Sequence, residues 1–349
     1  MITSARGLAD LITELEPHGR VAVDTEADSL HCYREKLCLL QISVPGHDVI
    51  VDPLADVDLA PLGYVLVKKE IVLHGSDYDL RLLRRNMSFV PERIFDTVIG
   101  ARMIGIHEFS LAALVKRYFD IELAKGSQKA NWAQRPLSAR MAEYAINDTR
   151  YLLSLAERLE AELNSRNRIE WFRQSCQRAL DFSAIDRERD VDEAWRISGA
   201  GALRGRASAV LRELWNWRER EAEAVDRPPF HILQNRELLD SAQRFAAGES
   251  PDYKHFSDRR RRAFREAAER ALKLPETEWP VRPKRSGARP TAEVIKRIEK
   301  LRHNRDHAAK ELQIEASFIA ARVALEAIAS EPSRAESLLV PWQRELLGS

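Results

Sequence analysis

Short apolar runs separated by polar turns dominate the first fifty residues. An amphipathic helix is predicted over residues 4–15, where four apolar side chains recur at helical spacing after Ser4, a favourable N-cap. Strands are predicted at 20–25, 37–44 and 48–51, where β-branched and apolar residues cluster. The short turns between them indicate an antiparallel meander that begins a sheet.

The pattern then changes to strands followed by helices. A helix is predicted over residues 59–67, a strand over 70–74 and a further helix over 77–86. Another helix follows at 98–104, and one long helix is expected from about 138 to 165. Alternation of this kind favours an α/β fold, a mixed sheet flanked by helices.

The second half of the chain is helical throughout. A proline-rich, basic stretch at 275–290 predicts a linker. The predicted domains are an α/β domain at residues 1–165, a helical connector at 166–204, and one or two all-α bundles at 205–280 and 291–349.

Composition and charge refine this picture. The net charge is +1, but residues 200–349 hold 29 Lys and Arg against 23 Asp and Glu, so the first 199 residues are acidic. This asymmetry fits a metal-dependent domain joined to a module that meets polyanions. Three cysteines without metal-ligand spacing, and no apolar run of membrane-spanning length, lead us to expect a cytoplasmic protein with no membrane association.

The first predicted strand ends in two carboxylates, Asp24 and Glu26, which alternation places on one face. Two like charges held together are explained by a divalent cation, because Mg²⁺ and Mn²⁺ prefer oxygen ligands. A third acid, Asp79, begins a helix after the strand at 70–74. Tyr144 and Asp148 lie four apart, hence on one helical face. Four carboxylates can hold two ions for an in-line phosphoryl displacement.

These residues stand in motifs that resemble the ribonuclease D branch of the DEDD 3′-to-5′ exonucleases. The matching segments cover about residues 1–165 in the family's order: Val23-Asp24-Thr-Glu26, Leu37-Cys-Leu-Leu-Gln41-Ile42, Leu73-His74-Gly-Ser-Asp-Tyr-Asp79-Leu80, Lys125-Gly-Ser-Gln-Lys-Ala-Asn-Trp132-Ala-Gln-Arg135-Pro136-Leu137 and Tyr144-Ala-Ile-Asn-Asp148. The resemblance implies a ribonuclease-H-like sheet.

The resemblance also implies roles. Asp24, Glu26 and Asp148 would hold the ion that generates the nucleophile; Asp24 would bridge to a second ion held by Asp79, directly or through water. Tyr144 would orient the attacking water, which places the chain in the tyrosine-type subgroup. The implied activity is two-metal-ion (Mg²⁺ or Mn²⁺) hydrolysis of RNA from the 3′ end, releasing nucleoside 5′-monophosphates.

The helical half resembles the family too. Residues 211–235 are similar to the helicase and RNase D C-terminal (HRDC) domain, a nucleic-acid-binding bundle, and 291–349 are interpreted as a second, diverged copy. The implied substrates are the 3′ ends of tRNA precursors or other structured RNA, and no obligate protein partner is evident.

Secondary candidates surround these motifs. Lys125, Lys129, Trp132 and Arg135 are predicted to contact RNA, because basic groups interleaved with an aromatic suit a single strand. The arginines at 259–262 are equally consistent with phosphate contact and with a solvated helix face.

The sequence also gives predictions for other residues near these motifs. Leu30, His31 and Tyr33 are alternative stacking partners for the terminal base, since the aromatic that many relatives carry after the Glu is absent. Asp28 is expected to be a solvent-facing turn residue, and His74 to support the site from behind.

Two rival functions remain open on sequence alone. A DNA exonuclease uses the same four acids, and dependence on the 2′-hydroxyl distinguishes it. A non-catalytic RNA-binding scaffold is the second alternative, although a scaffold has no use for so much carboxylate repulsion.

Overall fold

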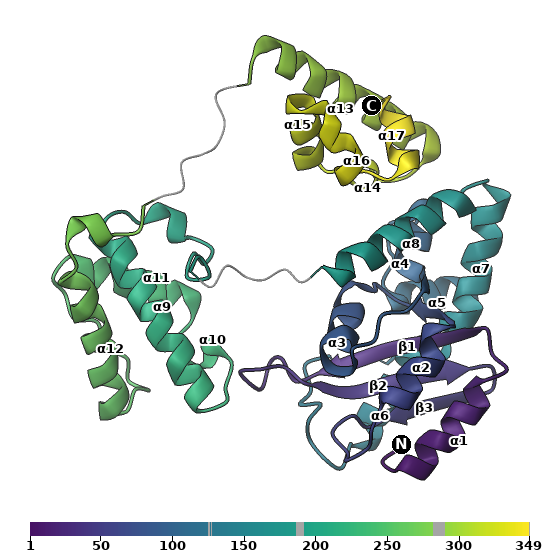
Figure 1. Ribbon diagram of the computed structural model, residues 1–349, viewed down its shortest axis with the longest axis horizontal. Coiled ribbons are helices and arrows are strands. Elements are labelled where there is room, and N and C mark those ends of the chain that lie inside the picture. Colours follow the sequence, from purple (N-terminus) through teal and green to yellow (C-terminus); the bar gives the residue numbers. More distant parts are fainter. Residues whose placement is uncertain (125, 127, 186–191, 282–289, 349) are drawn as a thin grey trace. The chain divides into compact units, whose positions relative to one another are not determined.

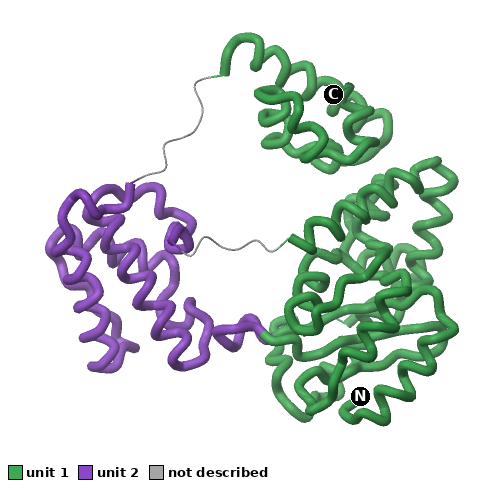
Figure 2. Tube along the Cα trace, in the orientation of Figure 1, with its two compact units in different colours: residues 1–27, 36–185, 288–349 green, residues 28–35, 186–287 purple. Residues whose placement is uncertain are grey.

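The computed structural model describes residues 1–124, 126, 128–185, 192–281 and 290–348 (Figure 1). The chain divides into two compact units (Figure 2). The first unit comprises residues 1–27, 36–185 and 288–349, and the second comprises residues 28–35 and 186–287.

A five-stranded mixed sheet is the frame of the first unit. Its order is β3-β2-β1-β4-β5, with antiparallel pairing among the first three strands and parallel pairing of β1 with β4 and of β4 with β5. The strands are β1 (Arg20–Ala27), β2 (Leu37–Val44), β3 (His47–Val51), β4 (Glu70–Leu73) and β5 (Arg93–Asp96). All eight residues of β2 are buried, as expected for a strand covered on both faces.

Eight helices of the first unit surround this sheet. They are α1 (Ala5–Leu15), α2 (Ala60–Val67), α3 (Asp77–Met87), α4 (Thr97–Met103), α5 (Leu111–Phe119), α6 (Ala139–Arg150), α7 (Leu152–Ser165) and α8 (Ile169–Ala184). The cap predicted at Ser4 is present, because its side chain accepts a backbone N–H at the start of α1, and Ser110 and Ser138 cap α5 and α6 in the same way.

Two predictions about these elements were wrong. The single long helix expected from 138 to 165 is divided at Tyr151 into α6 and α7. The two parts pack against different sets of elements: α6 packs on β1 to β3, whereas α7 packs mainly on α4 and also contacts α5, α8, β1 and β4. The short strand β5 was not predicted, because its four residues run directly into α4 and carry no turn signal.

Five further helices complete the first unit: α13 (Ala292–Leu312), α14 (Ala316–Ile319), α15 (Arg322–Ser330), α16 (Ala335–Leu338) and α17 (Pro341–Leu347), with a 3₁₀ turn at Pro332–Arg334. The buried Arg168 joins them to the sheet domain by donating to the carbonyl oxygens of Met103 (2.7 Å) and Leu312 (2.9 Å). Trp171 of α8 stacks on Trp342 of α17 with ring centroids 5.3 Å apart. These contacts make the last helices part of the first unit.

The second unit is a separate helical bundle. Its helices are α9 (Arg206–Ala224), α10 (Pro229–Ile232), α11 (Asn235–Ala246) and α12 (Asp258–Leu272), with 3₁₀ turns at Ala200–Ala202 and Glu276–Glu278. An aromatic core of Trp217, Phe245, Phe256 and Phe264 holds the bundle together. None of the helices in the described parts of either unit has the length and apolar content needed to cross a bilayer.

Gly105 marks a close backbone approach between α4 and α13. Its φ is +87°, and a Cβ at this position would lie 2.2 Å from the carbonyl oxygen of Gln313. Because the obstacle is backbone, it cannot rotate away. We therefore expect Gly105→Ala to lower the free energy of unfolding by about 2 kcal/mol or more, measured by chemical denaturation of the full chain.

Gly19→Ala is the matched control, because a Cβ at Gly19 meets nothing within 4 Å. Equal denaturation curves for the two variants would contradict the proposed close contact.

Candidate active site

The end of β1 presents two carboxylates on one face. Asp24 and Glu26 are two residues apart, so alternation of side chains along a strand directs both the same way. The last parallel pair between β1 and β4 joins Ala22 to Val72, whereas pairing with β2 continues to the end of the strand. The acids therefore lie beyond β4, where side chains from helices can reach them.

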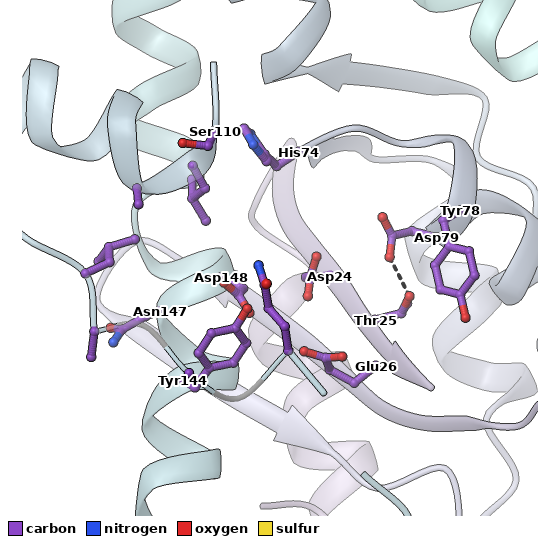
Figure 3. A pocket seen from close by; sticks show the side chains of 16 residues that line it. Asp24, Thr25, Glu26, His74, Tyr78, Asp79, Ser110, Tyr144, Asn147 and Asp148 are labelled. Atoms are coloured by element: carbon purple, nitrogen blue, oxygen red, sulfur yellow. Dashed lines mark hydrogen bonds between the residues drawn. The ribbon is translucent and has the colours of Figure 1, made fainter. Parts of the chain in front are cut away.

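Helix α6 supplies the third carboxylate. Oxygen atoms of Asp24, Glu26 and Asp148 all lie within 4.8 Å of one another, and each residue is half-buried (Figure 3). Tyr144 lies one turn earlier on α6 and faces the same cavity. The structure thus brings together residues that are more than 120 positions apart in the sequence.

Polar contacts fasten α6 to the sheet beside these carboxylates. The hydroxyls of Ser43 and Thr149 are 2.7 Å apart, and Ser43 donates to Asp48 at 2.8 Å. Arg150 donates to the other oxygen of Asp48 at 2.6 Å. Since Thr149 and Arg150 directly follow Asp148, this cluster fixes the position of that carboxylate.

Asp79 approaches from the other side of β1. Thr25, which points away from the face that carries Asp24 and Glu26, donates a hydrogen bond from its hydroxyl to Asp79. Asp96 accepts from the backbone N–H groups that precede α3 and so holds its first turn. Asp79 lines the same cavity but lies outside the group of three mutually close carboxylates.

Burial and mutual repulsion favour the protonated forms of these acids. Burial, followed by the charges of neighbouring carboxylates, raises the pKa of Asp24 well above its usual range and the pKa of Glu26 to about 9. The same causes raise the pKa of Asp148 to about 7. Burial raises the pKa of Asp79 to about 6, although the hydrogen bond from Thr25 opposes this.

Tyr144 remains a neutral phenol. Burial, followed by the charges of Asp148 and Glu26, raises the pKa of its hydroxyl, and a hydrogen bond from Gln128 only partly offsets this. The ring lies beside that of Trp132, with centroids 6.0 Å apart. Tyr144 can therefore position a water molecule by hydrogen bonding, but it is not a base at neutral pH.

An open cavity of about 650 Å³ contains all of these groups. Its walls are formed by Asp24, Thr25, Glu26, His74, Tyr78, Asp79, Ser110, Leu111, Ala112, Leu123, Ala124, Gly126, Gln128, Tyr144, Asn147 and Asp148. Sequence reasoning missed Tyr78, Gln128 and Asn147 as wall residues, although all three stand inside the matched motifs. It also missed Ser110 and Leu111, for which the sequence carries no signal.

His74 lines the cavity rather than supporting it from behind as predicted. Its Nδ1 lies 2.8 Å from the hydroxyl of Thr97, which itself donates to the carbonyl oxygen of Leu73. Nδ1 therefore carries the proton, and Nε2 is the acceptor. Burial lowers the pKa of His74, against the charge of Asp96, so the ring is neutral at physiological pH.

The loop residues predicted to contact RNA differ in their exposure and contacts. Lys125 lies outside the described residues, and Lys129 is exposed. Trp132 is only 1% exposed and packs under α6, so it is a core residue and not a stacking surface. Arg135 forms a two-pronged ion pair with Asp52, both contacts at 2.6 Å. The predicted RNA contact of Trp132 is therefore wrong, whereas that of Arg135, whose side chain is 25% exposed, stays a prediction.

The residues after Glu26 that were predicted to stack on the terminal base lie outside the cavity wall. Leu30, His31 and Tyr33 belong to the second unit and are not among the described residues that line the cavity. Tyr33 packs against the core of that helical bundle, and its backbone N–H donates to Asp226. Asp28 is 2% exposed, which contradicts the predicted solvent-facing turn residue; its carbonyl oxygen accepts two backbone hydrogen bonds.

Three of the four consecutive arginines of α12 form ion pairs within the second unit. Arg259 and Arg260 reach the buried Glu221, and Arg261 reaches Asp252. For those three side chains, the ion pairs favour a role on the helix face over phosphate contact.

The acidic cluster suits a divalent cation. Its donors are all carboxylate oxygens, the ligand type preferred by hard ions such as Mg²⁺ and Mn²⁺. Burial, followed by the charges of the neighbouring carboxylates, opposes ionisation of these groups. A bound cation would supply positive charge and displace protons.

Comparison with known proteins gives two domain matches. Residues 1–164 match a 3′-5′ exonuclease family, and residues 207–247 match the HRDC domain. A ribonuclease D from Pseudomonas paraeruginosa is 30% identical over 78% of this chain and 74% of the relative. A ribonuclease D from Sphingobium indicum is 31% identical over 69% of this chain, and the alignment spans 63% of that relative's length.

Among solved structures, Escherichia coli RNase D superposes with a TM-score of 0.73 at 24% identity, covering 100% of this chain and 96% of the other. The predicted fold class, a mixed sheet flanked by helices with helical C-terminal domains, is confirmed.

The repulsion within the cluster gives a pH prediction for the metal-free protein. Carboxylates whose folded pKa is raised contribute most stability below their unfolded pKa, near 4, and lose it as pH rises through 6 to 9. Asp24→Asn removes one of the repelling charges. In EDTA, we expect it to raise the thermal midpoint by roughly 2–4 °C at pH 9 and by much less at pH 5.

Asp52→Asn is the control of opposite sign, because Arg135 lowers the pKa of Asp52 and the pair is stabilising at high pH. It should lower the midpoint at pH 9. If Asp24→Asn were also less stable than the unsubstituted protein at pH 9, the carboxylates would not be in mutual repulsion.

Proposed function

Because the chain belongs to the ribonuclease D family, we propose that it is an exoribonuclease that hydrolyses RNA phosphodiesters from the 3′ end and releases nucleoside 5′-monophosphates. One observation carries the proposal: Asp24, Glu26 and Asp148 converge within 4.8 Å, in an open cavity shared with Asp79 and Tyr144. A bound cation accounts for such a set of carboxylates, because it offsets the cost of burying like charges together.

The proposed cofactors are two divalent ions, Mg²⁺ or Mn²⁺. Asp24, Glu26 and Asp148 would hold one ion, and Asp24 with Asp79 would hold the second, directly or through water. When bound, such ions activate a water molecule and neutralise the charge of the phosphodiester.

The chain's own groups then have distinct tasks. Tyr144 stays protonated and orients the attacking water, with Gln128 bonded to its hydroxyl. His74 presents an unprotonated Nε2 to the cavity, which suits it to accept a hydrogen bond from a ribose hydroxyl. An acceptor for a hydroxyl favours RNA over DNA as the substrate if it meets the 2′ position.

Structured RNA, such as a tRNA precursor, is the proposed substrate class. The solved Escherichia coli relative is described as an exoribonuclease involved in structured RNA processing. Helical modules that follow the catalytic domain can extend the contact with such RNA. A cytoplasmic location is proposed with this function, because the thiols of the three buried cysteines are in the reduced form.

We also propose that residues 291–349 are a second, diverged HRDC-like module. Each module has a long helix, a one-turn helix and a helix of middle length, α9-α10-α11 in one and α13-α14-α15 in the other. The one-turn helices end alike: Leu233 has φ −160° and ψ 130°, and Ala320 has φ −159° and ψ 130°. The proposed domain limits therefore remain 1–165, 166–204, 205–280 and 291–349.

Single-stranded RNA labelled at either end tests the activity. In Mg²⁺ or Mn²⁺, the 3′-labelled strand should release labelled mononucleotide at once, while the 5′-labelled strand shortens progressively. Asp24→Ala should reduce the rate by at least about 10³-fold and leave the fold intact by circular dichroism.

Matched DNA oligonucleotides separate the ribonuclease from the alternative DNA exonuclease. Endonucleolytic products, or full activity of Asp24→Ala, would contradict the proposed function; an absence of cleavage by the folded protein with either metal would support the scaffold alternative.

A further inference from the structure

Gln41 is a fully buried amide directly opposite Asp24. It lies in the middle of β2 with 0% exposure, and its partner across the antiparallel pair is Asp24. Directly opposed residues of an antiparallel pair direct their side chains to the same face of the sheet. Gln41 therefore lies on the face that carries the metal-binding carboxylates, behind the cavity wall that Asp24 forms.

Neither polar atom of the Gln41 side chain has a hydrogen-bond partner among the described residues. The neighbouring side chains on this face do not supply a hydrogen-bond partner. Leu39 and Ile50 are buried apolar residues, and the Ser43 hydroxyl is already bonded to Asp48 and Thr149. The acceptor that the strand register places next to the amide is the carboxylate of Asp24.

A buried amide without a partner is less favourable than an apolar side chain of the same size. Methionine or leucine would fill this position in β2 without that cost. The amide is therefore explained by a state of the protein in which it is bonded. The carboxylate of Asp24, directly opposite in the strand pair, would be the acceptor in that state, and carboxylates are strong acceptors of N–H hydrogen bonds.

We propose that Gln41 is a positioning residue whose amide N–H donates to the carboxylate of Asp24 and holds it oriented for the divalent ions. The inference rests on the proposed metal-dependent function. It assigns a role to the part of the Leu37-to-Ile42 motif that the catalytic residues leave unexplained. Substitution of a residue that hydrogen-bonds to a metal ligand commonly lowers metal affinity by about 10- to 100-fold.

Gln41→Met in the full chain tests the proposal, because it removes the amide and keeps the length of the side chain. Mn²⁺ binding is followed by the electron paramagnetic resonance signal of the free ion, and stability is followed by thermal melting in EDTA. We expect the dissociation constant for Mn²⁺ to rise about tenfold, while the midpoint in EDTA stays equal or rises.

Leu39→Met is the matched control: it lies on the same strand and face, opposite Glu26, and its substitution alters packing without removing a polar group. It should leave Mn²⁺ affinity unchanged. Saturating Mn²⁺ should restore most of the exonuclease rate of Gln41→Met, since the residue acts through Asp24.

The outcomes separate this inference from the proposed function. If the unsubstituted protein binds Mn²⁺ and Gln41→Met binds it equally well, the role of Gln41 is overturned and the function stands. A lower midpoint in EDTA with unchanged affinity, or an equal loss of affinity in Leu39→Met, also overturns it, because the effect is then one of packing. Failure of the unsubstituted protein to bind Mn²⁺ overturns both.

Discussion

Repulsion among buried carboxylates is the constraint on which the catalytic unit depends. When they are ionised, Asp24, Glu26 and Asp148 repel one another, and burial strengthens the repulsion between their charges. Rigid pairing of β1 with β2 holds two of them, and the Ser43, Asp48 and Thr149 contacts hold the helix that carries the third. Strain of this kind is tolerated where a ligand relieves it.

The same view explains what could be predicted from the sequence. An apolar run ending in Asp24 and Glu26 specifies a strand and a face, and the spacing of Tyr144 and Asp148 specifies a helical face. These are local patterns, and they were sufficient to identify the principal cavity residues. Trp132 and Arg135 differ because the burial of a loop is decided by tertiary packing: one meets the underside of α6, and the other meets Asp52 near the end of β3. No local pattern distinguishes these places from an exposed basic loop.

The helical half shows a similar limit. Its composition predicts helical bundles. Which unit each bundle joins depends on single long-range contacts, which the composition does not predict. Arg168 and Gly105 hold the last helices against the sheet domain, so residues 291–349 belong to the first unit although a proline-rich, basic stretch precedes them. The HRDC-matching residues 207–247 form their own core within the second unit. Two modules of similar helix pattern thus have different structural surroundings.

Anomalous diffraction from crystals of the full chain grown with Mn²⁺ and a nucleoside 5′-monophosphate tests the central claim most directly. The account predicts a manganese peak bounded by the carboxylates of Asp24, Glu26 and Asp148, with a second peak toward Asp79. Manganese bound only elsewhere, with these three carboxylates protonated and paired to one another, would contradict it.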